Sequence, residues 1–302
     1  MTRPIQHRLS RLRKRVRAAG TMCTLLLATT AYSESITLET YEDCKNAFKR
    51  LNTAQQSHNS EYGIDNTNNP IHFTSWNIQK ASQSGIKTDL QHLAGKSNFL
   101  ILQEAPDIPW IRALKHYNNF APGYIVGDTT TGVMVLGDTP QLLSCVFTHK
   151  EPWLRSPKAS SISVFELENG QKLAIANIHS INFTFGVKLY EQQLSNITQL
   201  LTLHHGPIVL SGDFNTWKRK RGQILKQNTE ALGLREVHFE TDFRSQVFGH
   251  VLDRFYIRNI HLEASQTEHY HSSDHNPLQV TLRLDSSPKH TLEGSNNAQH
   301  SP

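Results

Sequence analysis

The sequence has few cysteines, no long apolar run and, outside its first segment, no excess of positive charge. Three cysteines in 302 residues are too few for a disulfide-built scaffold or a cysteine-rich zinc module. No stretch of about 20 apolar residues is present, which excludes a multispan helical membrane protein. Hydrophobic residues still make up 37% of the chain, enough to bury a core and to exclude wholesale disorder.

The positive charge of the chain is concentrated at its start. The formal net charge is +5, but seven of the 31 Lys and Arg residues lie within residues 1–33, which contain no Asp or Glu. The other 24 basic residues face 26 acidic ones, so the rest of the chain is not basic. Global charge therefore gives no argument for a nucleic acid as the partner.

Residues 1–33 have the layout of a secretory signal. A basic stretch from Arg8 to Arg17 precedes an uncharged run with a short apolar centre, and Ala31 and Ser33 offer small residues before a cleavage point. We expect a signal peptide or an uncleaved N-terminal anchor, and a protein that is periplasmic or secreted. The alternative is a disordered basic arm.

The rest of the chain divides into an arm, a domain and a tail. Residues 34–69 are polar, and we expect one short helix and then a linker. Residues 70–285 hold the apolar segments of one globular domain, and residues 286–302 form a polar tail expected to be flexible. Cys44 of the arm and Cys145 of the domain are candidates for a disulfide in an oxidising compartment, with two separate thiols as the alternative.

Segments of strand length alternate with helix-like segments in the domain. Apolar residues at spacings of 3 and 4 predict an amphipathic helix over 187–201. The segments expected to form strands are 71–76, 98–103, 132–136, 141–147, 159–167, 172–179, 207–210, 252–257 and 277–284. This mixture predicts an α/β or α+β layered architecture with parallel and antiparallel pairing.

Several of these apolar strands end in carboxylate, amide or imidazole side chains. The strand-end residues are Asn77, Glu104, His179, Asp213, Asn215, Asp253, Asp274 and His275. Ligands bind where loops converge at strand ends, so the set predicts one polar pocket, although any single member is explained as a turn or cap residue. Carboxylate and amide oxygens suit Mg²⁺ or Mn²⁺, and histidines beside carboxylates suit proton transfer. No G-x-S-x-G nucleophile motif accompanies them.

The order of these motifs resembles the endonuclease/exonuclease/phosphatase superfamily, the DNase I-like proteins. The motifs that carry the resemblance are Trp76-Asn77, Gln103-Glu104, Asn177-Ile178-His179, Gly212-Asp213-Phe214-Asn215, Leu252-Asp253-Arg254 and Ser273-Asp274-His275. The similarity spans about Ile71–Leu284 and extends furthest to the bacterial YafD-like branch. It implies a four-layer α/β sandwich, with two packed mixed β-sheets flanked by helices and the site at one end.

The resemblance also implies the hydrolysis of a phosphoester by an activated water with a Mg²⁺ or Mn²⁺ ion. Glu104 is the expected main metal ligand, with Asn77 beside it and Asp274 as a further ligand. His179 is expected to bind phosphate or to protonate the leaving group, and Asn215 to orient the phosphate or the water.

The general base is left open between two residues. Asp213 is one candidate, and His275, oriented by the carboxylate of Asp253, is the other. Arg155 and Lys158 precede a strand and are candidates for contacts with the substrate phosphate, with a solvated face as the alternative.

We expect an exported nuclease or phosphodiesterase that acts as a monomer, without a stable protein partner, on a phosphoester substrate such as DNA or RNA. One alternative is a phosphomonoesterase or a lipid-headgroup phosphodiesterase of the same superfamily. The other is a catalytically inactive binding protein. A fold that serves so many chemistries does not name the substrate.

Overall fold

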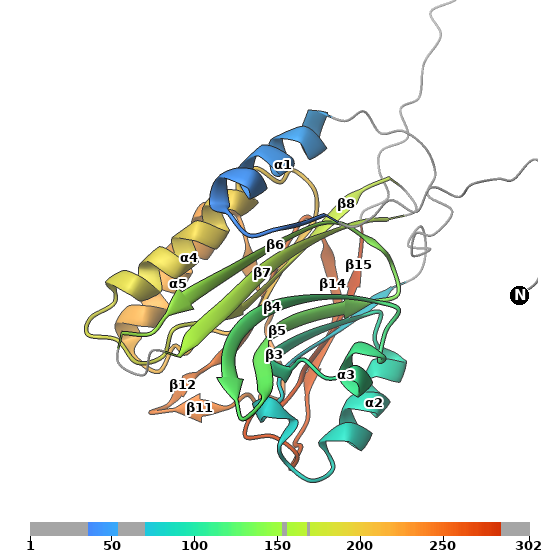
Figure 1. Cartoon of the computed structure of the whole chain (residues 1–302), viewed down its shortest axis with the longest axis vertical. Coiled ribbons are helices and arrows are strands. Elements are labelled where there is room, and N and C mark those ends of the chain that lie inside the picture. The colour runs from blue at the N-terminus through green and yellow to red at the C-terminus, as the bar shows by residue number, and fades with distance from the viewer. Residues whose placement is uncertain (1–35, 54–69, 153–155, 168–169, 285–302) are drawn as a thin grey trace, which may run out of the picture. The chain divides into compact units, whose positions relative to one another are not determined.

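Two β-sheets pack face to face in the computed structural model, which describes residues 36–53, 70–152, 156–167 and 170–284 (Figure 1). The predictions for residues 1–33, for Arg155 and for the tail at 286–302 fall outside these residues. Within the described ranges, no helix is both long and apolar enough to cross a membrane.

The first sheet has seven strands and both kinds of pairing. Its spatial order is β1 (Ile36–Leu38), β6 (Gln141–Lys150), β7 (Pro157–Glu166), β8 (Lys172–His179), β9 (Ile208–Asp213), β13 (Asp253–Arg258) and β10 (Arg235–Glu236). The pairs β1–β6 and β8–β9 are parallel, and the other pairs are antiparallel.

The second sheet has six strands. Its spatial order is β14 (His261–Thr267), β15 (Leu278–Arg283), β2 (Ile71–Asn77), β3 (Phe99–Pro106), β5 (Thr129–Gly137) and β4 (Tyr117–Val126). Only β2–β3 is a parallel pair in this sheet. A separate small hairpin joins β11 (Gln246–Val247) to β12 (His250–Val251).

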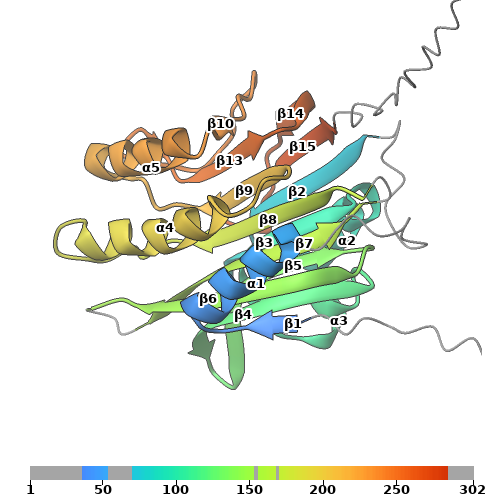
Figure 2. The same ribbon diagram turned by 90° about the horizontal axis from the view of Figure 1, so that it is seen from above.

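Helices cover the outer face of each sheet, which gives four layers (Figure 2). The first sheet is covered by α1 (Tyr41–Thr53), α4 (Lys188–Leu201) and α5 (Arg219–Ala231), and the second by α2 (Ile86–Lys96) and α3 (Pro109–Arg112). The predicted α/β sandwich of two mixed sheets flanked by helices is therefore confirmed.

The alternation of side chains along β8 shows how the sequence separates the layers. Leu173 and Ile175 point into the apolar core between the sheets, while Ala174 and Ile178 pack against the helices. Successive residues of a strand face opposite sides, so a strand that is apolar on both faces is buried in the middle of a sandwich.

One buried amide joins the two sheets just below the site. Asn177 is completely buried, and its Nδ2 donates to the carbonyl oxygens of Leu102 and Met134 in the other sheet. Its Oδ1 accepts from Nε2 of Gln103 at 2.8 Å. Because both polar atoms of the Asn177 amide have partners in the other sheet, this side chain fixes the spacing of the sheets at the strand ends.

Several elements were not anticipated from the sequence. β4 contains Pro122 and Gly123, which weaken a strand pattern, and its pairing with β5 shifts register between Pro122 and Ile125. β14 is an edge strand whose side chains are mostly exposed, so it lacks the apolar alternation that marks a buried strand.

The polar arm contributes two elements that pack on the first sheet. β1 pairs with β6, and Phe48 of α1 is fully buried with residues of α4. Cys44 and Cys145 form a disulfide with a Cα–Cα distance of 5.9 Å. This bond ties α1 to β6.

Replacing both Cys44 and Cys145 by alanine is expected to lower the free energy of unfolding by about 2–4 kcal/mol. The cross-link joins residues 101 positions apart, and losing it frees a long loop in the unfolded chain. Urea unfolding of the folded protein measures the change. A reducing agent should destabilise the wild type by a similar amount and leave the double variant unaffected; equal stability of the two proteins would contradict the prediction.

Candidate active site

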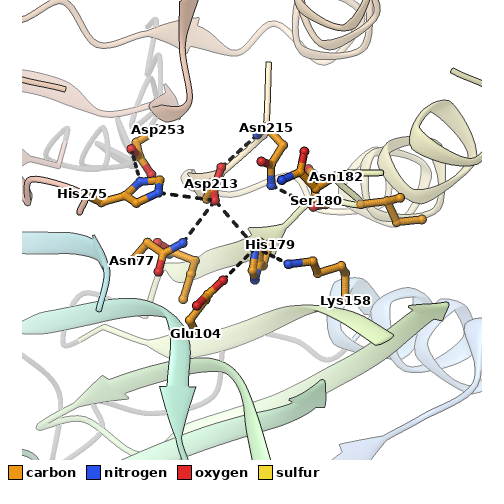
Figure 3. Close-up of polar contacts among 12 residues, drawn as sticks. Asn77, Glu104, Lys158, His179, Ser180, Asn182, Asp213, Asn215, Asp253 and His275 are labelled. Atoms are coloured by element: carbon orange, nitrogen blue, oxygen red, sulfur yellow. Dashed lines mark hydrogen bonds and ion pairs between the residues drawn. The ribbon is translucent and has the colours of Figure 1, made fainter. Parts of the chain in front are cut away.

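Several strands end in polar residues that face the other sheet, and these residues lie together at one edge of the core between the sheets. In β2, β8 and β9 the positions that face the other sheet end in Asn77, His179 and Asp213, and β13 begins with Asp253 on the same face. All four side chains are at most 4% exposed. Figure 3 shows Asn77 and His179 turned toward Asp213, and Asp253 behind His275, although these residues come from both sheets.

Glu104 reaches the same centre through a break in the strand pattern. Simple alternation along β3 would place it on the helix-covered face with Leu100 and Leu102. The pairing of β3 with β5 shifts register between Leu102 and Ala105, and Glu104 has a left-handed backbone with φ 47°. A β-bulge of this kind redirects a side chain, here from the helix side into the pocket.

The Gly-Asp-Phe-Asn segment is shaped by the close approach of β8. Gly212 has φ 147°, and a Cβ at this position would lie 2.0 Å from the carbonyl oxygen of Ile178. Only glycine fits there. Asp213 then accepts a hydrogen bond from the backbone N–H of Asn215 at Oδ1, and Asn215 donates from Nδ2 to the carbonyl oxygen of Ser180.

The second carboxylate oxygen of Asp213 is the centre of the group. Its Oδ2 accepts from Nδ2 of Asn77 at 3.1 Å, and it lies 3.6 Å from Nε2 of His179 and 4.0 Å from Nε2 of His275. Burial, followed by the neighbouring carboxylate of Asp253, raises the pKa of Asp213 to about 6, although the charge of His275 opposes this.

His275 is held by a buried carboxylate on its far side. Its Nδ1 lies 2.7 Å from Oδ2 of Asp253. Burial alone would lower the pKa of His275, but the charge and hydrogen bond of Asp253 and the charge of Asp213 raise it to about 10. The imidazole is therefore a cation at neutral pH, with Nε2 turned toward Asp213.

His179 has the opposite character. Burial and the nearby ammonium of Lys158 lower its pKa well below the usual value. Nζ of Lys158 lies 2.9 Å from Nε2 of His179, and since an ammonium can only donate, Nε2 is the acceptor. Lys158, from β7, is 8% exposed, and no carboxylate among the described residues forms an ion pair with it.

A second lysine, which sequence reasoning missed, enters from the other side. Lys80 lies in a short turn, Gln79–Ala81, whose three residues all have positive φ, and its ammonium donates to Oε2 of Glu104. The ring of Tyr124 lies 5.7 Å from Nζ of Lys80 and 5.4 Å from Nζ of Lys158. The only sequence signal for Lys80 was its place three residues after Asn77.

These groups line one pocket with a volume of about 440 Å³. Among the polar residues that line it are Asn77, Lys80, Glu104, Lys158, His179, Asp213, Asn215 and His275. Asp274 also lines it and is exposed. Asp253 lies behind His275 and acts on the pocket through it. Arg155 lies outside the described residues.

Comparison of the amino-acid sequence with those of known proteins identifies the family of this chain. The chain is 35% identical to a UPF0294 protein of Vibrio parahaemolyticus over 222 residues, 72% of this chain and 79% of that protein. It is 36% identical to a UPF0294 protein of Yersinia enterocolitica, over 69% of this chain and 82% of that one. The chain belongs to the UPF0294 family. No protein-family model matches it.

Solved structures share the fold of this UPF0294 protein at low sequence identity. An endonuclease/exonuclease/phosphatase from Bacteroides vulgatus superposes with a TM-score of 0.57 at 14% identity, over 72% of this chain and all of that one. A second, from Beutenbergia cavernae, gives 0.55 at 13%, over 73% of each chain. The fold is therefore that of the endonuclease/exonuclease/phosphatase superfamily.

The UPF0294 pocket has the donors that a divalent cation needs. Asp213, Asp253 and His275 each offer one ligand atom, and these atoms lie within 4.8 Å of one another, so this buried group could hold a metal ion. Nδ1 of His275 is already bonded to Asp253, however. The oxygens of Glu104 and Asn77 open into the same pocket and form, with Asp213, a set of hard donors that fits Mg²⁺ or Mn²⁺.

The loop after β8 is fixed from both sides by buried charged residues. The carboxylate of Glu151, 1% exposed, accepts from the backbone N–H groups of Asn182 and Phe183. The guanidinium of Arg221, also 1% exposed, donates to the carbonyl oxygens of Ile181 and Asn182 at 2.6 Å each. The wall of the pocket is thus set before any ligand binds.

Arg221 is the last of four consecutive basic residues, 218–221, and differs from the other three in its surroundings. Residues 218–220 are exposed, but Arg221 is buried against the rings of Tyr190 and Trp217 and supports the loop.

Proposed function

We propose that this UPF0294 protein is an exported, metal-dependent phosphodiesterase. The observation that carries the proposal is the convergence of two carboxylates, an amide oxygen, a histidine held by Asp253 and a buried lysine on one pocket, in the fold of the endonuclease/exonuclease/phosphatase superfamily. The Cys44–Cys145 disulfide supports export, because disulfides persist in oxidising compartments. Action as a monomer and kinship with the YafD-like branch stay predictions.

The residues divide the work of hydrolysis. Oδ2 of Asp213 takes a proton from the attacking water, since it lies at the centre of the group while Oδ1 is fixed by Asn215. The imidazolium of His275, held by Asp253, and the ammonium of Lys158 face the non-bridging phosphate oxygens and stabilise their growing charge.

Hydrolysis of the diester needs only water as the second reactant. The water oxygen bonds to phosphorus, the ester P–O bond breaks, and the leaving oxygen takes up a proton from solvent, which gives a phosphomonoester and an alcohol. Glu104 and Asn77 are the residues that would hold the cation, which leaves Oδ2 of Asp213 for the water. When bound, the cation would supply charge stabilisation to the phosphoryl oxygens.

A substrate panel with the purified protein tests the proposal. We expect turnover of diesters, represented by supercoiled plasmid, an oligoribonucleotide, bis(4-nitrophenyl) phosphate and phosphatidylcholine, at a higher rate than of 4-nitrophenyl phosphate. EDTA should abolish turnover and Mg²⁺ or Mn²⁺ should restore it. A monoester preference or turnover indifferent to EDTA would contradict the proposal, and a folded protein inert on every ester would identify a binding protein.

A further inference from the structure

Exposed apolar side chains gather around the mouth of the pocket. The large exposed apolar residues within the described ranges are Ile36, Ile125, Val126, Phe183, Phe185, Leu189, Val247 and Phe248. All except Ile36 belong to segments that follow or join the strand ends at the site. Apolar residues scattered singly over a surface are ordinary, but a collection at one end of the molecule marks an interaction surface.

Three separate loops bring these residues to the rim. Phe183, 53% exposed, follows β8 and lines the pocket, and Phe248, 84% exposed, lines it from the β11–β12 turn. Ile125 and Val126, 70% and 43% exposed, follow Tyr124, whose ring lies over Lys158. Apolar tips from two of these loops therefore line the pocket, and those of the third follow the tyrosine that contacts its lysines.

Phe248 occupies a backbone position that suits it poorly. It has φ 52° and Gly249 has φ 74°, in the two-residue turn between β11 and β12. Turns with two positive φ values favour Asn-Gly, because a bulky side chain is strained there. With the ring 84% exposed, packing does not offset this strain, which indicates a role for the ring outside the folded chain.

Cations stand beside the apolar tips. Lys188 begins α4, and Lys218, Arg219 and Lys220 lie at the start of α5; all four are exposed. Nζ of Lys218 lies 4.3 Å from the ring centre of Trp217, which lines the pocket. Apolar tips flanked by Lys and Arg are the composition of a surface that enters the boundary between lipid headgroups and acyl chains.

We propose that this face docks on a lipid bilayer and that the phosphodiester of a lipid headgroup is the substrate; the second half rests on the proposed phosphodiesterase function. Phe183 and Phe248 have faces on which a nucleobase could stack, but Ile125, Val126 and Val247 are aliphatic and do not, and this mixture favours acyl chains over bases. Phe183, Val247 and Phe248 line a pocket, whereas a protein that binds a single strand lines a groove with its stacking side chains. Hydrolysis would then release a phosphomonoester and an alcohol, one of them staying in the bilayer.

Tryptophan fluorescence at the rim tests docking separately from catalysis. Phe248→Trp, in the whole protein with EDTA present, is mixed with vesicles of phosphatidylcholine and phosphatidylglycerol in which the phosphatidylcholine acyl chains are brominated. We expect the emission of this variant to be quenched at least about twofold more than that of the wild type, because the new indole ring would lie among the brominated acyl chains. Ile36→Trp is the control and should not gain quenching, because Ile36 is exposed on β1 and in register with the start of β8, at the end of the sheet away from His179.

The outcomes separate the two halves of the proposal. Equal quenching in Phe248→Trp and wild type would overturn docking whatever the chemistry, and a change only with a single-stranded oligonucleotide would favour nucleic acid. Quenching without release of the headgroup in the presence of Mg²⁺ would support docking on the bilayer and contradict the proposal that a lipid headgroup phosphodiester is the substrate. Ile125→Thr, outside the pocket, should lower turnover of vesicle phosphatidylcholine by about tenfold, as expected for losing the burial of one aliphatic side chain, and leave bis(4-nitrophenyl) phosphate turnover unchanged.

Discussion

Asp213→Asn is expected to lower kcat for diester hydrolysis by about 10²–10⁴-fold, the usual contribution of a positioned general base. Asparagine keeps the size of the side chain but cannot take a proton from water at Oδ2. The Asn215 contact at Oδ1 stays, while the amide nitrogen at the Oδ2 position no longer accepts from Asn77. Steady-state kinetics on a soluble diester measures the effect, with KM close to the wild-type value.

Stability should change much less than activity in this variant. Burial and Asp253 raise the pKa of Asp213 to about 6, so the charged form is disfavoured in the folded protein. A neutral side chain relieves that cost at pH 7, which offsets the lost hydrogen bond from Asn77, so the melting temperature should stay close to the wild-type value. Asp138→Asn, an exposed carboxylate paired with Lys115, is the matched control for activity. A kcat within tenfold of wild type would reject Asp213 as the base.

Glu104→Gln is expected to reduce activity by at least about 100-fold at a fixed Mg²⁺ concentration, since ligand losses cost this much or more in metal affinity or rate. The bulge in β3 aims this carboxylate into the pocket, and an amide offers one neutral oxygen in its place. The Mg²⁺ concentration that gives half-maximal activity should rise at least about tenfold.

A thermal shift with Mg²⁺ gives a second readout for Glu104. Binding to the folded state alone stabilises it, so Mg²⁺ should raise the melting temperature of the wild type more than that of the variant. Glu230→Gln, which changes an exposed carboxylate on α5, is the control and should behave as wild type. An unchanged Mg²⁺ dependence in Glu104→Gln would place the cation elsewhere in the pocket.

The two-residue alternation of side chains along the strands could have predicted part of the site from the sequence. The inward-facing positions of β8 are Leu173, Ile175, Asn177 and His179, and the same count along β9 ends at Asp213. Two-residue alternation is a local property, so it can be counted in the sequence once the strands are assigned. Glu104 does not follow this alternation, because the direction of its side chain depends on a bulge that forms only when β3 pairs with β5.

The supporting charges could not be recognised from the sequence. Arg221 stands in a run of four basic residues, and nothing local separates it from its three exposed neighbours. Its burial follows from the packing of α5 beside α4, where the rings of Tyr190 and Trp217 enclose the guanidinium. Glu151 is likewise recognisable only after β6 and the loop following β8 have come together.

The sequence by itself determined the kinds of strands, their apolar faces and the polar residues that end them, because alternation and turn chemistry act over a few neighbouring positions. The tertiary structure alone decided that Asn77, Glu104, His179, Asp213 and His275 meet, and that apolar tips from three distant loops surround them. Contacts between residues more than a hundred positions apart depend on how the two sheets pack, and that packing is a property of the whole chain.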